Sequence, residues 1–368
     1  MTLVLNNQEI AQVTKMKDVL DHLELSFKDQ ALGRTVDRPR SHANTPLDGD
    51  ELGSRFYEFK SMDGSVQRYR VHALRINSNV IFQDTRNGQK RWELDPVAPG
   101  GNTVGLLFLF SIDTGELLAI MKDRHLQEMR VGATSALAAK GIARKDSSII
   151  GLFGTGGQAG PQLEALSHCF GIKEVKVYSP TEGHRKTFVQ RMQERYPFEV
   201  REARDPKDVV LGSDIIVCAT NSWKNVFDGE WLVPGQHVNS LQAWELDRLT
   251  FERANKIIVR SMVQSIYAYM GDEGSWQEPV RSDIKGIVED KLYTLGNALL
   301  GNVAREEDEI TLHSGSGAGG SSGLGGTQFA AIGHLIYEKA KEAGIGQEIP
   351  SEWFWQKQGI DFLYGDQK

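Results

Sequence analysis

The 368-residue sequence has few cysteines, no long apolar run and no excess of basic residues. Its two cysteines, Cys169 and Cys218, lie in apolar surroundings without metal-ligand spacing. We therefore expect buried thiols in a reducing compartment, with neither a disulfide framework nor a metal site. No apolar stretch approaches the roughly 20 residues that span a bilayer. The amino-terminal residues also lack the basic and apolar regions of a signal peptide, so the sequence predicts a cytoplasmic protein that does not contact a membrane.

The charge balance argues against a nucleic-acid partner. The formal net charge is −7, whereas nucleic-acid binding needs a basic footprint. Hydrophobic residues make up 40% of the chain and charged residues 25%, which is typical of a globular protein. The length is sufficient for two domains of ordinary size. We therefore expect any basic site to be local and inward-facing.

Strand-like and helix-like segments alternate through the middle of the chain. Apolar residues recur at helical spacing from Asp123 to about Arg144. Further helices are expected at 160–169 and 184–196, and strands at 147–153, 174–178, 213–219, 237–241 and 256–259. This alternation predicts parallel βαβ units, and so an α/β fold with a Rossmann-type, doubly wound parallel sheet.

The two ends of the chain show a mixed pattern. We expect strands at 3–5, 71–76, 103–110, 116–121 and 309–312, helices at 15–31 and 328–343, and a loop at 83–102. The segment from His313 to Gly326 is rich in glycine. A flexible tether and a tight loop that lines a ligand site are both consistent with this composition.

A glycine-rich motif follows the strand expected at 147–153 and leads directly into a helix. Its residues are Gly154, Thr155, Gly156, Gly157, Gln158 and Ala159. Gly154 permits a tight turn, Gly156 allows the backbone to approach a pyrophosphate, and Ala159 allows close packing of helix on strand. The helix amino terminus then presents N–H groups to the phosphates. The motif in this context predicts a nicotinamide dinucleotide site.

The end of the second strand of this unit helps to distinguish the two nicotinamide cofactors. NAD sites usually carry an acidic residue there for the ribose hydroxyls. This chain has Ser179 and Thr181 at the strand end, with Arg185 close behind. Hydroxyls and a guanidinium suit a 2′-phosphate, so we expect NADP(H) in preference to NAD(H), although Glu182 leaves NAD(H) open.

Polar residues also follow the later strands of the sheet. Thr220, Asn221 and Ser222 come directly after the strand at 213–219, and Asn239 belongs to the next one. Ligands of doubly wound sheets bind at the carboxyl ends of strands. We therefore assign these four residues to the cofactor site.

Several stretches together resemble the ornithine cyclodeaminase/μ-crystallin family, of which this chain looks like a divergent member. The resemblance covers about residues 40 to 340 and is carried by Met129–Lys140, Gly154–Ala159, Asp214–Ser222, Gly229–Asn239 and Asp308–Thr311. It implies a second α+β domain, built from both chain ends, that binds substrate and forms a homodimer. In this chain that domain would comprise residues 1–123 and 311–368, with the dinucleotide-binding domain at 124–310. The substrate would be an amino or imino acid, which exchanges a hydride at its α-carbon.

The resemblance also implies which residues bind the substrate. Arg130 matches the arginine that holds the substrate carboxylate, and it shares a helix face with apolar residues. Arg40 resembles a second carboxylate contact, although a loop arginine is often simply solvated. Arg75 stands where the family has a lysine, and its permanent charge makes it a poor proton donor. Three arginines in one pocket would favour a substrate with more than one anionic group.

A second departure concerns the residues after Asn239. Cyclodeaminases carry an acid/base aspartate there, but this chain has none, and Asp247 instead matches a helix-capping position. Glu245 is an open substitute. The sequence therefore favours an imine reductase or amino-acid dehydrogenase. An NAD-dependent ammonia lyase of the ornithine cyclodeaminase type and a non-catalytic, crystallin-like dinucleotide-binding protein remain the alternatives.

Overall fold

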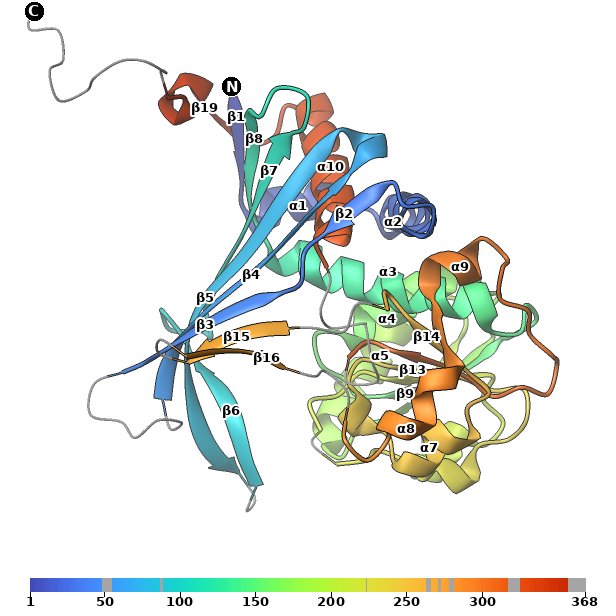
Figure 1. Ribbon diagram of the computed structural model, residues 1–368. Helices are drawn as coiled ribbons and strands as arrows, with labels where there is room; N and C mark the ends of the chain where they lie inside the picture. The colour runs from blue at the N-terminus through green and yellow to red at the C-terminus, as the bar shows by residue number, and fades with distance from the viewer. Residues whose placement is uncertain are drawn as a thin grey trace, which may run out of the picture.

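The computed structural model describes residues 1–47, 55–86, 89–222, 224–262, 266–270, 273–277, 281–316 and 325–356. Their strands form two sheets, an eight-stranded parallel sheet and an eleven-stranded mixed sheet. Helix α3 (Arg124–Ile142) runs between them (Figure 1). The α/β fold predicted from the sequence, with a Rossmann-type sheet and a second α+β part built from both chain ends, is confirmed.

The parallel sheet has the order β11-β10-β9-β12-β13-β18-β14-β17. Its strands are β9 (Ile149–Phe153), β10 (Glu174–Tyr178), β11 (Glu199–Glu202), β12 (Ile215–Cys218), β13 (His237–Ser240), β14 (Lys256–Val259), β17 (Leu292–Thr294) and β18 (Thr311–Ser314). Every residue of β12, β13 and β18 is buried, as expected of a parallel sheet covered on both faces. Besides α3, the α-helices that accompany this sheet are α4 (Ala159–Cys169), α5 (Glu182–Arg195), α6 (Pro206–Val210), α7 (Arg248–Arg253), α8 (Lys285–Val288) and α9 (Leu295–Leu299).

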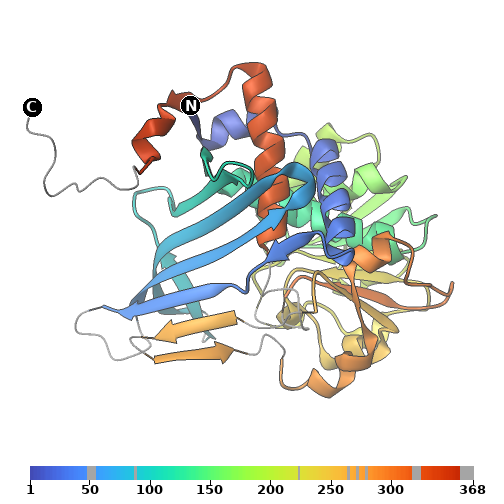
Figure 2. The ribbon, with the colours of Figure 1, turned by 45° about the horizontal axis from the view of Figure 1, so that its top comes forward.

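The mixed sheet has the order β16-β15-β3-β4-β5-β7-β8-β1-β19, with β2 paired to β4 and β6 to β5. Its strands are β1 (Thr2–Leu5), β2 (Thr35–Asp37), β3 (Ser41–Pro46), β4 (Arg55–Val66), β5 (Val71–Arg86), β6 (Gln89–Asp95), β7 (Val104–Ser111), β8 (Leu117–Lys122), β15 (Ile266–Met270), β16 (Glu273–Gln277) and β19 (Gln347–Ile349). Helix α10 (Gly326–Ala343) lies across the long strands, and α2 (Met16–Ala31) packs beside it (Figure 2). Helix α1 (Asn7–Val13) also packs against α10.

The loop expected at 83–102 is a wrong prediction for most of that range. Strand β5 continues to Arg86 and pairs in antiparallel fashion with β6. The pair extends away from the rest of the molecule (Figure 1). Such an extension does not need a buried apolar face, so its many charged residues are compatible with strands despite giving a loop-like sequence.

Two segments belong to a different sheet from the one that the predicted domain division assigns to them. Strands β15 and β16 come from the middle of the chain, yet β15 pairs in parallel with β3 of the mixed sheet. Strand β18 lies between β13 and β14 of the parallel sheet, so the return to the mixed sheet begins after Ser314. The division into domains at residues 123 and 310 stays a prediction. Much of the glycine-rich segment, at 317–324, lies outside the described residues.

None of the described helices is long and apolar enough to cross a membrane. Cys218 is buried and Cys169 partly buried, and both are free thiols. Burial raises the pKa of each thiol, that of Cys169 to about 11. Neither is poised for reaction at neutral pH.

Candidate functional site

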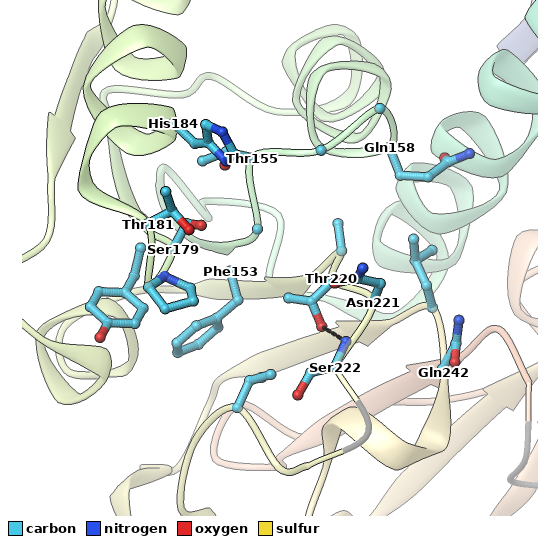
Figure 3. A pocket seen from close by; sticks show the side chains of 18 of the residues that line it. Phe153, Thr155, Gln158, Ser179, Thr181, His184, Thr220, Asn221, Ser222 and Gln242 are labelled. Atoms are coloured by element: carbon cyan, nitrogen blue, oxygen red, sulfur yellow. Dashed lines mark hydrogen bonds between the residues drawn. The ribbon is translucent and has the colours of Figure 1, made fainter. Parts of the chain in front are cut away.

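A cavity of about 760 Å³ opens at the carboxyl ends of the parallel strands β9, β10 and β12. The phosphate loop forms one wall, and the segments after β10, β12 and β13 form the others (Figure 3). Its lining residues are Phe153, Gly154, Thr155, Gly156, Gly157, Gln158, Tyr178, Ser179, Pro180, Thr181, His184, Ala219, Thr220, Asn221, Ser222, Asn225, Val226, Leu241 and Gln242. The cavity is therefore at the edge of the sheet where ligands of doubly wound folds bind.

The phosphate loop has the backbone geometry that its glycines predict. Gly154 has a φ of +102°, and a Cβ there would lie 2.3 Å from the carbonyl oxygen of Ala219. No L side chain could occupy this position without displacing the neighbouring strand end. A Cβ on Gly156, by contrast, would meet no atom of the described residues within 4 Å. It would project into open space beside the loop, which is where a pyrophosphate needs room.

Helix α4 starts directly after this loop and is held close to α3. A Cβ on Gly132 would lie 2.4 Å from the carbonyl oxygen of Pro161, so a residue without a side chain is required at this crossing. The Ala159 side chain is fully buried at the start of α4. These contacts fix the amino end of an 11-residue helix against the loop. The loop and helix together fit a dinucleotide pyrophosphate.

The segment after β10 presents hydroxyls and an imidazole to the cavity. Ser179, Thr181 and His184 gather at one end of it (Figure 3). Arg185 does not line the cavity: its Nε donates to Glu202 at 2.7 Å and its Nη1 to the Ser179 carbonyl at 2.6 Å. No carboxylate lines the cavity within the described part of the chain. The acidic residue typical of an NAD ribose site is thus missing from this wall.

Glu245 organises the opposite end of the cavity. Its Oε1 accepts hydrogen bonds from the backbone N–H and the hydroxyl of Thr220, both at 2.7 Å. Its Oε2 accepts from the Ser240 hydroxyl and the Gln242 N–H, both at 3.1 Å. Burial raises the pKa of Glu245. Glu245 therefore positions the two loops whose residues Thr220 and Gln242 line the cavity.

Asn221 and Ser222 also line this end, and the Ser222 N–H donates to the Thr220 hydroxyl (Figure 3). Asn239 does not line the cavity. It is buried within β13, with its Oδ1 3.2 Å from His237 Nε2, so its assignment to the cofactor stays a prediction. Asp247 caps α7 by accepting from Thr250 N–H at 2.8 Å, which confirms the capping role expected from the sequence.

Two of the predicted arginines meet around the ring of Phe329, at the start of α10. The guanidinium carbons of Arg75 and Arg130 lie 5.4 and 5.1 Å from the ring centroid. Arg75 and Arg130 are both buried, and each residue is only 8% exposed to solvent. Arg75 is paired with Asp123, with Nε 2.7 Å and Nη2 2.6 Å from the same carboxylate oxygen.

Arg130 has a different set of partners. Its guanidinium donates to the amide oxygens of Gln127, at 2.8 and 3.1 Å, and of Gln328, at 3.3 Å. Burial, followed by the nearby charges of Arg260, Arg75 and Arg40, lowers the pKa of Arg130. A buried arginine held by neutral acceptors has a charge that a bound carboxylate can compensate.

Arg40 precedes β3 and faces the same cluster. Its Nε is buried and has no hydrogen-bond partner among the described residues. Burial, together with Arg75, lowers the pKa of Arg40 to about 10. The structure therefore brings all three predicted arginines together, in the space between the two sheets.

Two further cations were missed by the sequence reasoning. Arg260, only 7% exposed, directly follows β14, and burial together with Arg40 lowers its pKa to about 10. Lys60 of β4 pairs with Glu58 at 2.8 Å, and its pKa is lowered by burial, with smaller effects from Arg40 and Arg75. The position of Arg260 at the carboxyl end of a predicted parallel strand was a usable signal. Lys60 gave none, because β4 was not expected.

The cation cluster lies next to the dinucleotide cavity and consists of Arg40, Lys60, Arg75, Arg130 and Arg260. Leu241 lines the cavity, and its carbonyl oxygen would lie 2.7 Å from a Cβ on Gly315. The Gly315 carbonyl in turn accepts from Arg260 Nη2 at 3.4 Å. A single backbone segment thus separates Arg260 from the cavity wall. A substrate among the arginines would lie next to the end of the cavity that holds Asn221 and Gln242.

Comparison with known proteins gives consistent relatives. The chain is 33% identical to a Delta(1)-pyrroline-2-carboxylate reductase of Bacillus cereus, over 94% of this chain and 99% of that protein. Among solved structures it resembles the Thermococcus litoralis Delta(1)-pyrroline-2-carboxylate reductase in complex with NADH and L-proline, with a TM-score of 0.74 and 25% identity over 95% and 100% of the two chains. It also resembles an archaeal alanine dehydrogenase dimer with bound NAD, with a TM-score of 0.73 and 26% identity over 95% and 99%.

Two of these relatives are named as Delta(1)-pyrroline-2-carboxylate reductases and one as an alanine dehydrogenase, and the two solved structures hold NADH and NAD. The sequence pattern of the ornithine cyclodeaminase/mu-crystallin family matches residues 97–344, and the resemblance inferred from the sequence is confirmed. This chain belongs to the ornithine cyclodeaminase/mu-crystallin family.

Proposed function

We propose that the protein is an NADP(H)-dependent oxidoreductase that interconverts an imino acid and an amino acid by hydride transfer, as an imine reductase or an amino-acid dehydrogenase. The observation that carries this proposal is the position of Arg130. It is buried, held by two amide oxygens, and lies in a cation cluster next to a dinucleotide cavity. A substrate carboxylate bound there would neutralise the charge of the Arg130 guanidinium. The relative solved with L-proline is consistent with such a substrate.

The residues of this chain would act mainly by binding and orientation. The nicotinamide, when bound, supplies or accepts the hydride. Arg130 would hold the substrate carboxylate bidentately, which fixes the α-carbon relative to the cavity. Arg75, oriented by Asp123, would polarise the substrate. Arg40 would add a second cationic contact to the substrate. Arginines do not exchange protons at neutral pH, so an imine that is already protonated in water is the fitting substrate form.

The cofactor preference follows from the wall formed after β10. Ser179, Thr181 and His184 offer donors there without a competing carboxylate, which suits a 2′-phosphate better than free ribose hydroxyls. Arg185 would act from behind by fixing the Ser179 carbonyl. Fluorescence titration should therefore show tighter binding of NADPH than of NADH, and the opposite order would refute this preference.

We also propose a homodimer, because the archaeal alanine dehydrogenase relative is a dimer. The mixed sheet is the face that the sequence resemblance assigns to dimer contacts. Light scattering coupled to gel filtration should give about twice the mass of the 41.0 kDa chain. A monomer at micromolar concentration would refute the dimer without affecting the proposed chemistry.

The proposed activity is tested by following NADPH oxidation with cyclic imino acids and with 2-oxo acids in ammonium buffer. The wild-type protein should oxidise NADPH, and Arg130→Met should lose this activity while still binding NADPH. Ammonia release from ornithine without added NADPH would instead indicate a cyclodeaminase. Nucleotide binding without turnover of any imine would indicate a non-catalytic, crystallin-like protein.

A further inference from the structure

We propose that the substrate carries a second anionic group besides its α-carboxylate, and that Arg40 and Arg260 bind this group. The inference rests on the proposed function and deepens it, because it names the substrate class as a short 2-imino dicarboxylic acid and its amino acid. Arg260 would thereby select dicarboxylate over monocarboxylate substrates.

The fold brings Arg40 and Arg260 together from distant parts of the chain. Arg40 lies just before β3, and Arg260 just after β14. The chain that continues from Arg260 crosses to the mixed sheet, where the Tyr267 N–H donates to the Arg40 carbonyl at 2.9 Å. The two arginines therefore flank the point where the two sheets are joined.

Arg260 also lies near the amino end of α10, which carries the aromatic ring around which Arg75 and Arg130 gather. A Cβ on Gly325 would lie 3.9 Å from Arg260 Nη1 and 3.6 Å from the Phe329 ring. The same ring has Arg75 and Arg130 beside it. The α-carboxylate site at Arg130 and the proposed second site are thus neighbours, so a short carbon chain can connect the two anionic groups.

Each carboxylate near the cluster already has partners of its own. Asp123 pairs with Arg75, and Glu58 pairs with Lys60. Asp37, whose charge acts on Arg260, accepts from the Thr327 N–H at 3.1 Å and from Gln30 Nε2 at 3.2 Å.

Neither Arg130 nor Arg40 is hydrogen-bonded to a carboxylate among the described residues. Arg130 donates to amide oxygens, and Arg40 Nε is buried without an acceptor in the described part of the chain. Buried cations of one sign need compensating anions. A substrate carboxylate bound between Arg40 and Arg260 would lower the repulsion that Arg40 exerts on Arg260.

The reaction balances without any further component. Reduction of the protonated 2-imino dicarboxylic acid forms one C–H bond at the α-carbon with a hydride from NADPH and converts the C=N double bond into a single bond. NADPH becomes NADP⁺, and the amine takes one further proton from water. In the other direction the amino acid loses the hydride to NADP⁺, and water releases ammonium from the imine.

The test compares 2-oxo acids in ammonium buffer by NADPH and NADH oxidation. Pyruvate is the monocarboxylate probe, and oxaloacetate and 2-oxoglutarate are the dicarboxylate probes. We expect kcat/KM for the better dicarboxylate to exceed that for pyruvate by roughly 10- to 100-fold, the effect of one charged hydrogen-bonding site. Arg260→Met should lower kcat/KM for the dicarboxylate more than that for pyruvate, and so remove this preference. Arg204→Met, at a surface side chain that is 85% exposed, is the matched control.

Arg260→Lys serves if the methionine variant does not fold, because it keeps the charge but loses the bidentate geometry. It should lower dicarboxylate turnover selectively. Equal turnover of both classes, or an equal loss of both in the variant, would overturn the second subsite while leaving the proposed function intact.

If no imine oxidises NADPH, the proposed function fails, and succinate binding then decides the subsite. Succinate should raise the melting temperature of the wild-type protein more than butyrate does, and Arg260→Met or Arg260→Lys should abolish the difference. No difference between the two acids in the wild-type protein would overturn the subsite.

Discussion

Replacing Gly156 by alanine separates cofactor binding from stability. The added Cβ meets no atom within 4 Å in the part of the chain that the structure describes, and the φ of Gly156 is not in the left-handed region. The folded protein therefore accommodates it, and the free energy of unfolding should change by less than about 0.5 kcal/mol. The same Cβ would project into the space where the pyrophosphate approaches the loop.

The size of the binding defect follows from the hydrogen bonds that the methyl group disturbs. Displacing the pyrophosphate weakens at least one hydrogen bond from a backbone N–H to a charged oxygen, which contributes about 1.5–3 kcal/mol. The dissociation constant for NADPH should therefore rise roughly 10- to 150-fold. Fluorescence titration measures this rise, and thermal unfolding of the same sample measures stability.

Gly171→Ala is the matched control, because its Cβ also meets nothing within 4 Å but lies after the far end of α4. It should bind NADPH like the wild-type protein. If Gly156→Ala binds NADPH as tightly as the wild-type protein does, the pyrophosphate does not rest on this loop, and the reasoning is refuted.

Three further predictions concern the substrate clamp, the interior and the packing of α3. Arg130→Met should lower kcat/KM at least about 10-fold with an unchanged NADPH dissociation constant, since it removes a charged clamp outside the dinucleotide cavity; a parallel loss of NADPH binding would contradict this placement. Burial lowers the pKa of His237 to about 3 and of His313 to about 4, whereas unfolded histidine titrates near 6.5. Below pH 6.5 the unfolded state therefore binds protons first, and each histidine should lower the free energy of unfolding by up to about 1.4 kcal/mol per pH unit between pH 6 and 4. Urea unfolding should show a shallower pH dependence for His313→Gln, and an unchanged slope would count against the buried neutral imidazole. Gly132→Ala should destabilise the protein by about 1–3 kcal/mol in the same assay, because its Cβ would overlap the Pro161 carbonyl; wild-type stability would show that α3 and α4 separate freely.

The sequence predicted the dinucleotide-binding unit well because its signals are local. Strand β10 has the predicted bounds, and α4 begins within one residue of its predicted start. Apolar runs, a glycine motif and helical periodicity are all read within about 30 residues. Strands β3, β4 and β6 were missed because their polar and charged residues do not give the apolar pattern of a buried strand, although β3 pairs with β4 and β5 with β6 close by in the sequence.

The part of the candidate site that depends on sequence motifs was predictable. The part that depends on the crossing of β15 to the mixed sheet was not. Arg40 and Arg130 were found through the family resemblance, and the structure places them in one cluster. Arg260 meets Arg40 only because β15 crosses to β3, a non-local pairing that periodicity cannot show. Arg185 was expected at the cofactor, but it is engaged by Glu202, a residue of the neighbouring strand.

The central claim is that the cation cluster presents an imine carbon to the nicotinamide. It is tested most directly by incubating the protein with NADPH deuterated at C4 on the transferred face, a 2-oxo acid and ammonium. Mass spectrometry of the amino acid formed should show one deuterium, at the α-carbon. An amino acid without deuterium, or consumption of the labelled cofactor with no amino acid formed, would contradict the account.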